Sequence, residues 1–413
     1  MTDPTAGSRR ANIALDGINF SLADVRDGLG PYLATYLLTV QKWDEASIGM
    51  VMSIATASGI IAQTPAGGLI DATRAKRAVM ATAAIAVAAA SLLLPLCSGF
   101  ISVAASQAAA HVSAAVFGPG LAAISLGIVG HAAFTRRIGR NESFNHAGNA
   151  FAAIAAGATA YLWGPDVVFY LLAIMSAASV LGILMIPAGA IDDALARGLN
   201  DRVGETEDTR AHSDTPSGLR VLFACRPLMI LAIAVVFFHL ANAAMLPLMA
   251  GVLTTRSGDL ATVFVAACMV GPQVIVAVFS PWVGRKASAW GRRPLLLIAF
   301  ATVPVRGLLF GLVTNPYLLI AVQLLDGIAG AVLAVTVTLI VVDMTRGTGH
   351  FNLGQGIVGT TMGIGASLSP TLAGYVSDRF GSATAFFGLA AIAAVGLAAV
   401  WALMTETRPA ENE

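Results

Sequence analysis

Long apolar segments recur along the whole chain with short polar breaks between them, and they constrain the fold more than any other feature. A transmembrane helix needs about 17 to 25 mainly apolar residues. Twelve segments reach this length, at 14–40, 46–71, 77–97, 100–129, 144–164, 167–188, 225–253, 260–283, 294–313, 317–343, 353–376 and 383–404. A spanning strand would need an alternating pattern and a closed barrel, so we expect every segment to be a helix.

The composition requires a lipid bilayer as the surrounding medium. Of the 413 residues, 57% are hydrophobic and 11% are charged, and the mean hydropathy is +0.78. Soluble domains carry about 25% charged residues. A net charge of +1 argues against nucleic acid as a partner. The three cysteines lie in or beside apolar runs, and their spacing matches neither a disulfide framework nor a metal site.

A polar stretch at 189–224 separates six expected spans from six. The sequence therefore predicts an N-terminal six-helix bundle at 1–188, a solvated cytoplasmic linker at 189–224, and a C-terminal six-helix bundle at 225–413. No apolar leader precedes the first span, so we expect the N-terminus to be retained.

The basic residues predict the orientation in the membrane. Outside the spans, all Lys and Arg residues except Lys42, Arg256 and Arg379 fall in segments on one side. The positive-inside rule places that side in the cytoplasm, together with both termini. We expect an integral protein of the plasma membrane, of the bacterial inner-membrane kind.

An internal repeat supports the division into halves. Short patterns recur at an offset of 216 to 218 residues: 20–24 with 238–242, Pro31 with Pro247, 65–67 with 281–284, and 107–111 with 323–327. Parallel repeats of this kind build transporters that alternate access around a central cavity. The expected fold is an all-α polytopic membrane protein with twelve transmembrane helices in two pseudo-symmetric six-helix bundles around such a cavity.

The turn after the second span carries a family signature. Residues 67–77 read GGLIDATRAKR and resemble the cytoplasmic motif of the major facilitator superfamily, G-x-L-x-D-(R/K)-x-G-(R/K)-(R/K). A weaker copy at 284–293 keeps the glycines and the basic pair but has Ser288 where the acid belongs. The resemblance covers the whole chain and implies a twelve-helix transporter of this superfamily. It also implies a cytoplasmic gate formed by Gly67, Asp71, Arg74, Lys76, Arg77, Gly284, Gly291, Arg292 and Arg293.

The chemistry of this turn can be argued without the family. Asp71 ends a helix, so its carboxylate can face basic side chains or the N-terminus of a neighbouring helix and stabilise one conformation. In the other interpretation, the basic residues of the turn only set the topology. Three departures concern the subfamily. Arg74 replaces the expected glycine, and the fifth span lacks the glycine-rich run typical of drug and metabolite antiporters. The arginine usual in the fourth span of many proton-coupled members is absent, and Gln107 is the nearest candidate for its place.

Charges inside the first span point to its function. Ionisable residues in the bilayer interior are costly, and those that occur generally face water or a partner. Asp24 and Asp27 share one helical face, with Arg26 between them. Pro31 cannot donate to the carbonyl of Asp27, so we expect the helix to break here, as discontinuous helices do at transporter binding sites.

These acids are candidates for proton coupling. If Arg26 compensates Asp27, Asp24 is the acid without an assigned partner, and it can gain and lose a proton as access alternates. Asp24 is therefore the first candidate and Asp27 the second. In the structural alternative, both acids brace Arg26.

The second half carries matching polar groups. The seventh span contains His239, Asn242 and Pro247, near the positions that match Asp24 and Pro31. Arg306 and Asp326 lie at similar distances from the turn between the ninth and tenth spans, so they could neutralise each other. We expect a cavity lined by His239, Asn242, Arg306, Gln323 and Asp326. Alternatively, Pro247 is a tolerated kink, His239 is packing, and the charge pair is purely structural.

These observations favour a proton-coupled secondary transporter of a small organic solute, in either direction, working as a monomer. The alternative is a receptor or regulator with a transporter-like fold that binds without turnover. A channel suits two pseudo-symmetric halves less well. Motifs of metalloproteases, serine hydrolases and P-loop proteins do not occur. We therefore expect no enzyme activity, no cofactor and no metal.

Overall fold

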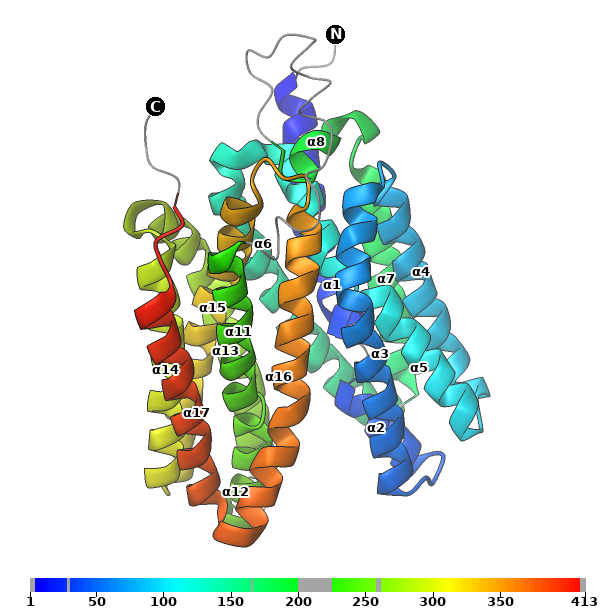
Figure 1. The fold of residues 1–413 in the computed structure, drawn as a ribbon. Helices are drawn as coiled ribbons and strands as arrows, with labels where there is room; N and C mark the ends of the chain where they lie inside the picture. Colours follow the sequence, from blue (N-terminus) through cyan, green and yellow to red (C-terminus); the bar gives the residue numbers. More distant parts are fainter. Residues whose placement is uncertain (1–3, 28–29, 165, 200–224, 258–260, 409–413) are drawn as a thin grey trace. The chain divides into compact units, whose positions relative to one another are not determined.

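The computed structural model describes residues 4–27, 30–164, 166–199, 225–257 and 261–408, and these residues are helical with short connections (Figure 1). The helices of the first half are α1 (Pro4–Asp27), α2 (Gly30–Thr39), α3 (Glu45–Ala72), α4 (Lys76–Leu93), η1 (Leu94–Leu96), α5 (Phe100–Ala114), α6 (Phe117–Trp163), α7 (Val167–Met185), η2 (Ala188–Ala190) and α8 (Asp193–Ala196). Those of the second half are α11 (Arg226–Asn242), α12 (Met245–Ser257), α13 (Ala261–Trp290), α14 (Arg292–Leu312), α15 (Pro316–Thr345), α16 (Phe351–Phe380) and α17 (Ser382–Leu403).

Most of these helices are long enough to cross a bilayer. Within the described ranges, nine stretches combine the required length and hydropathy. The stretch Phe100–Trp163 is 64 residues long and contains two expected spans, while α1 with α2 and α16 account for the other two. The chain is thus an all-α polytopic membrane protein with twelve spans in two sets of six.

The chain forms two compact units. The first, unit 1, contains residues 1–134, 144–217 and 347–356, and the second, unit 2, contains 135–143, 218–346 and 357–413. Two short segments therefore group with the opposite half: the middle of α6 with unit 2, and the start of α16 with unit 1. The boundaries at 188 and 225 that the sequence suggests stay a prediction.

Helix packing repeats between the units. In unit 1, α3 packs on α5, α4 on α5, and α7 on both α1 and α4. In unit 2, α13 packs on α15, α14 on α15, and α17 on both α11 and α14. These four pairings correspond one to one, which is what a parallel duplication of a six-helix unit produces.

Glycines allow a further close helix crossing in each unit. A Cβ added to Gly148 of α6 would lie 2.0 Å from the carbonyl oxygen of Phe20 in α1. In unit 2, a Cβ on Gly365 of α16 would lie 2.4 Å from the carbonyl oxygen of Val236 in α11. Small residues let membrane helices approach at backbone distance, and here they do so at positions 217 residues apart in the repeat.

The fourth span departs from the expected single helix. It is divided between α5 and α6, with a turn at Ala115 and Val116. Pro119 cannot donate to the carbonyl of Ala115, and its ring crowds that carbonyl, so the helix stops there and restarts. The α6 helix then bends at Gly130, whose φ is 68°. The matching helix α15 runs without interruption.

The first part of the expected linker is packed in places. Ala194, Ala196 and Leu199 are buried, and the amide of Gly347 donates to the carbonyl of Gly198 at 2.7 Å. Some residues of the expected solvated stretch are therefore buried, whereas Gly189 and Asp192 are exposed, and the linker as a whole stays a prediction. The remainder, 200–224, lies outside the described residues.

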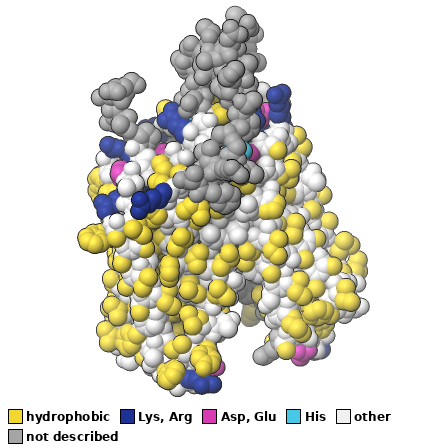
Figure 2. Space-filling view, in the orientation of Figure 1, with side chains coloured by type: hydrophobic (Ala, Val, Ile, Leu, Met, Phe, Trp, Pro, Cys, Tyr) yellow, Lys and Arg dark blue, Asp and Glu magenta, His cyan; other side chains and the backbone are white. Residues whose placement is uncertain are grey.

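Apolar side chains cover the outer sides of the helices, as Figure 2 shows, whereas Lys and Arg side chains gather near helix ends. Ile101 is 81% exposed and Tyr161 is 90% exposed. Such exposure would be unfavourable in water and is ordinary for side chains that face lipid.

Candidate functional site

The seventh span is discontinuous at its polar residues. Helix α11 ends at Asn242, and α12 begins at Met245. Pro247 is the third residue of α12, in the first turn, where an amide has no helical acceptor in any case. The amide of Ala244, freed by the break, donates to Oγ of Ser369 at 2.9 Å. Pro247 thus lies in a helix start rather than in a kink.

This break faces a buried arginine. Arg306 of α14 forms an ion pair with Asp326 of α15, the pairing that the sequence positions suggested. Its Nη2 donates to Oδ1 of Asn242 at 2.7 Å, and its Nε lies 3.4 Å from Sδ of Met245. The Phe310 ring lies 5.8 Å from Cζ, within cation–π range. The two helix ends at the break therefore hold one guanidinium.

Two further polar groups border this pair. Gln323 is fully buried, and its Nε2 donates to Oδ2 of Asp326 at 3.4 Å. Within the described residues, Oε1 of Gln323 and Nε2 of His239 are buried without a hydrogen-bond partner. Unpaired buried polar atoms are costly, so a site for a polar ligand is one explanation for their retention. We call His239, Asn242, Arg306, Gln323 and Asp326 the polar cluster.

Exposure differs sharply within the polar cluster. The side chain of Arg306 is 1% exposed, whereas that of Asp326 is 27% exposed. The guanidinium is thus fixed inside unit 2, and the carboxylate forms the accessible edge. A carboxylate in this position can contact a ligand, while the arginine holds it in place.

In the first span, α1 ends at Asp27 and α2 begins at Gly30, and the residues between them, where the sequence predicts a break, lie outside the described residues. The backbones of Asp24, Arg26 and Asp27 lie in α1, but their side chains are outside the described residues. Their proposed roles stay predictions.

Sequence reasoning passed over polar residues earlier in α1. Asp16 and Asn19 are buried at 7% and 3% exposure, and the hydroxyls of Ser21 and Ser179 are 2.8 Å apart. The available signal was the apolar context of Asp16, which lies within the first expected span but before the regular pattern around Asp24.

In unit 1, the turn after α3 is organised by Asp71. Its carboxylate accepts hydrogen bonds from the amides of Asn352 at 3.2 Å and Leu353 at 2.7 Å, and from Nδ2 of Asn352 at 2.8 Å. These amides belong to the first turn of α16, so the acid caps that helix. Of the two partners that the sequence suggested for Asp71, a helix N-terminus is present. The acid is buried, with 6% exposure.

The basic residues of this turn have other partners. Nζ of Lys76 pairs with Asp193 of α8 at 2.9 Å. Arg77 donates to the carbonyls of Ile183 and Leu184 at 3.2 and 3.1 Å, at the end of α7. Arg74 is exposed. The gate residues of this copy are thus in one region but form separate contacts.

The second copy of the turn, in unit 2, uses a different acid. Arg292, the first residue of α14, binds Asp343 of α15 at 2.8 Å. The amides of Arg292 and Arg293 donate to the carboxylate of Glu406 at 2.8 and 3.1 Å, and Nη2 of Arg293 donates to the carbonyl of Trp401 at 2.7 Å.

Burial raises the pKa of Glu406, but amide hydrogen bonds from Arg292, Arg408, Arg293 and Thr407 outweigh it, so the pKa lies below its ordinary value. Gly291, with a φ of 89°, ends the turn, and a Cβ there would lie 2.3 Å from Oε2 of Glu406. Glu406 thus caps α14 as Asp71 caps α16.

Sequence reasoning missed Asp193, Asp343, Asn352 and Glu406. A signal existed for Asp343, an acid that is the last residue of the long apolar segment 317–343. The other three contact chain segments that are remote in sequence, and the residues around them give no indication of these contacts.

Known proteins resemble the chain over nearly its whole length. A family profile described as the Major Facilitator Superfamily matches residues 15–272 and 231–413. A relative in Mycobacterium tuberculosis, named an uncharacterized MFS-type transporter, is 48% identical over 394 residues, covering 95% of this chain and 93% of the relative.

Two solved structures share the fold. The proton:xylose symporter XylE, bound to 6-bromo-6-deoxy-D-glucose, has a TM-score of 0.75 at 14% identity and covers 98% of each chain. The human organic anion transporter MFSD10 has a TM-score of 0.70 at 16% identity, covering 97% of this chain and all of that one. With a profile and a relative that both span most of its residues, this membrane chain belongs to the Major Facilitator Superfamily, a family of transporters of small-molecule solutes.

Proposed function

We propose that the protein is a secondary active transporter that moves a small organic solute by alternating access, coupled to protons. The observation that carries this proposal is the polar cluster of unit 2, a fully buried arginine paired with a partly exposed acid among apolar helices. Ionisable groups kept inside a membrane bundle mark solute and ion pathways more often than they serve stability.

In this proposal the polar cluster is the solute site of unit 2. Asp326 provides the accessible carboxylate, Arg306 fixes it, and Gln323 and His239 contribute hydrogen-bonding atoms that lack a partner among the described residues. The break between α11 and α12 supports the assignment, because discontinuous helices present polar backbone groups where a membrane protein binds its cargo.

Asp24 carries the coupled proton, with Asp27 as the second candidate and Arg26 as the balancing charge. A carboxylate free of a permanent partner can change protonation with each cycle, and a locked ion pair cannot. The residues of the two repeated turns act as the cytoplasmic gate, since each turn joins helices through charge contacts that can break and re-form. The protein works as a monomer, without a cofactor or an enzymatic step.

The mycobacterial relative supports a bacterial inner membrane as the location, with both termini in the cytoplasm. The basic residues at helix ends support that orientation.

The test is a solute screen in proteoliposomes with an imposed pH gradient. We expect Asp24→Asn to abolish gradient-driven flux while solute–solute exchange across the membrane continues, because exchange needs the site but no net proton transfer. Asp166→Asn, which neutralises an exposed acid before α7, is the matched control and keeps both activities. Unchanged gradient-driven flux in Asp24→Asn would remove this residue from coupling. Solute binding without flux would favour the receptor interpretation.

The same screen separates a solute site from a structural ion pair. The double variant Arg306→Gln with Asp326→Asn removes both charges and keeps the shapes, so it leaves no unpaired buried charge. If the pair is only structural, this variant folds and transports. We expect it to fold and to lose solute binding at least tenfold, measured by the solute-dependent shift in its unfolding temperature.

A further inference from the structure

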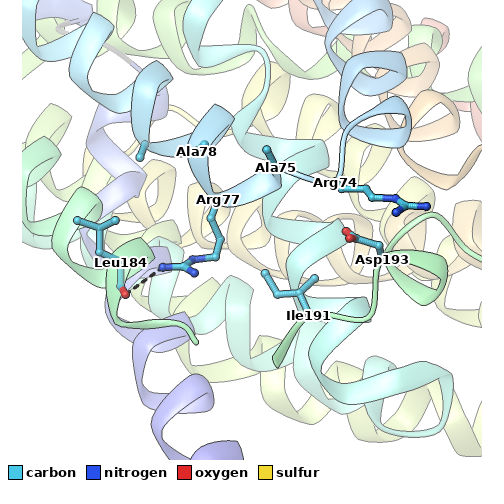
Figure 3. A pocket seen from close by; sticks show the side chains of 8 residues that line it. Arg74, Ala75, Arg77, Ala78, Leu184, Ile191 and Asp193 are labelled. Carbon is cyan, nitrogen blue, oxygen red and sulfur yellow. Dashed lines mark hydrogen bonds between the residues drawn. The ribbon is translucent and has the colours of Figure 1, made fainter. Parts of the chain in front are cut away.

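A cavity of about 290 Å³ lies in unit 1 at the junction of α4 and α7 (Figure 3). Its lining includes Arg74, Arg77, Ala78, Leu184, Ile191 and Asp193. Figure 3 shows the Arg77 side chain reaching from α4 toward Leu184, with Ile191 on the other side of Arg77 and Asp193 next to Arg74. The lining thus joins two guanidinium groups to an apolar floor.

The charge balance of this cavity is positive. Among the described residues that line it, Asp193 is the one acid, and it is already paired with the buried Lys76, which is not part of the lining. Within the part of the chain that the structure describes, Arg74 has no hydrogen-bond or ion-pair partner. Arg77 is held through Nε and Nη2 by two carbonyls of α7 and keeps its full charge, because carbonyls do not neutralise it. Two positive charges therefore remain for an anion.

An apolar surface leads away from the cavity along both helices. Ile85 of α4 lies one turn beyond Ala81, and it is 57% exposed. On α7, Leu181 and Leu184 share a face, and they are 63% and 59% exposed. Both helices are membrane spans, so this strip faces lipid chains while the arginines lie at the level where the spans end.

We propose that this cavity binds the phosphate of an anionic phospholipid, with the acyl chains lying on the strip formed by Ile85, Leu181 and Leu184. Basic side chains at the cytoplasmic end of membrane helices attract anionic headgroups, and each contributes a favourable contact near the surface. A free phosphate would meet the same arginines but would leave the apolar floor and strip without a partner. The lipid accounts for both features.

This site is separate from the polar cluster and does not depend on the transport proposal. Its residues belong to the connection between α3 and α4 and to the segments around α7, and Lys76 and Arg77 tie these elements together. A lipid phosphate on Arg74 and Arg77 would add a bridge at the same place. We therefore expect the bound lipid to stabilise unit 1 against heat.

The test uses purified full-length protein in detergent micelles with added phosphatidylglycerol or phosphatidylcholine, read by native mass spectrometry. The wild type is expected to keep one tightly bound phosphatidylglycerol molecule and none of phosphatidylcholine. Arg74→Gln weakens this binding about fivefold, from the loss of one basic group near the surface. Ala78→Glu, at an exposed helical position, weakens it further by placing a negative charge in the cavity.

Arg379→Gln is the matched control, since it removes one positive charge from the end of α16, far in sequence from the cavity residues. It should retain the tightly bound lipid. Equal retention by the wild type, Arg74→Gln and Ala78→Glu would overturn the proposal. Inorganic phosphate or glycerol phosphate that raises the unfolding temperature as much as phosphatidylglycerol would also overturn it, because the apolar strip would then contribute nothing.

Discussion

The two repeated turns occupy the same place in the duplicated fold but are held by different chemistry. In each, a glycine near the end of the second span of its half, in α3 or α13, contacts a backbone segment from the other half of the sequence. A Cβ on Gly67 would lie 2.1 Å from the carbonyl oxygen of Asn352, and one on Gly284 would lie 2.9 Å from that of Thr135. Gly67 and Gly284 are 217 residues apart, as are Thr135 and Asn352.

The difference lies four residues further on, where Asp71 corresponds to Ser288. Helix α16 begins at Phe351, so the amides of Asn352 and Leu353 are in its first turn and need an outside acceptor. The matching part of α6 is already helical from 131 onward, and Thr135 has a carbonyl four residues before it. An acid at 288 would find no free donors.

In unit 2, the capping acid lies next to backbone amides that have no helical acceptor. The first amides of α14, at Arg292 and Arg293, are free, and Glu406 accepts both. Where a helix starts therefore decides where a capping acid is useful, and the second copy of the turn has no acid at 288, where the neighbouring segment is already helical. The comparison teaches that the second copy of the motif, although it lacks the acid at 288, can still connect its helices through another acid, Glu406.

The strongest test of this comparison is steric. Gly67→Ala forces a methyl group into a backbone carbonyl, which is expected to cost about 3 kcal/mol, because backbone cannot move aside as a side chain can. Gly284→Ala also meets a backbone carbonyl, but at 2.9 Å, so it needs a smaller backbone shift and should cost less, about 1 to 2 kcal/mol. The unfolding temperature can be followed with a thiol-reactive dye on the free cysteines Cys97, Cys225 and Cys268.

Gly388→Ala in α17 is the control, because nothing lies within 4 Å of the position that the added methyl group would take, and the variant should unfold no earlier than the wild type. If Gly67→Ala and Gly284→Ala lowered the unfolding temperature equally, the two glycine contacts would be equally tight. The steric difference between the two turns would then be refuted.

The second test addresses the charge. Asp71→Asn keeps the size of the side chain but loses the charge that caps α16. We therefore expect the free energy of unfolding to fall by about 2 kcal/mol and transport to be slower. Ser288→Ala, at an exposed position, should change stability by less than about 0.5 kcal/mol. Ser288→Asp should not restore the Asp71→Asn variant. If Ser288→Asp made the Asp71→Asn variant more stable, unpaired amide donors would have to be available beside α13.

The sequence predicted the helical class, the twelve spans and the duplication because hydropathy and periodicity are local properties that lipid makes unambiguous. It also suggested the pairing of Arg306 with Asp326 and the helix N-terminus as a partner for Asp71. Each of these rests on counting from a span end, which long membrane helices make reliable.

Contacts between segments remote in sequence could not be predicted in this way. The bond from Lys76 to Asp193 and the cap from Glu406 depend on how the chain returns after the last span of each half. The break in the fourth span at Ala115 was predictable in principle from Pro119, but the apolar run around it masks the signal.

The smallest effect that distinguishes the turns is a dependence on pH. The pKa of Glu406 is lowered in the folded protein, so its stabilising contribution is present above the ordinary value of 4.5 and is lost as pH falls through the folded-state pKa. The group is largely exposed, so solvent screening limits the effect to less than about 1 kcal/mol, or roughly 1 to 2 °C. Glu406→Gln should therefore unfold slightly earlier than the wild type at pH 7, and the gap should close toward pH 4. Ser288→Ala, in the same turn but without a titrating group, should differ from the wild type by the same amount at both pH values. A gap for Glu406→Gln that stays constant over this range would show that its carboxylate does not cap α14 as a charged group.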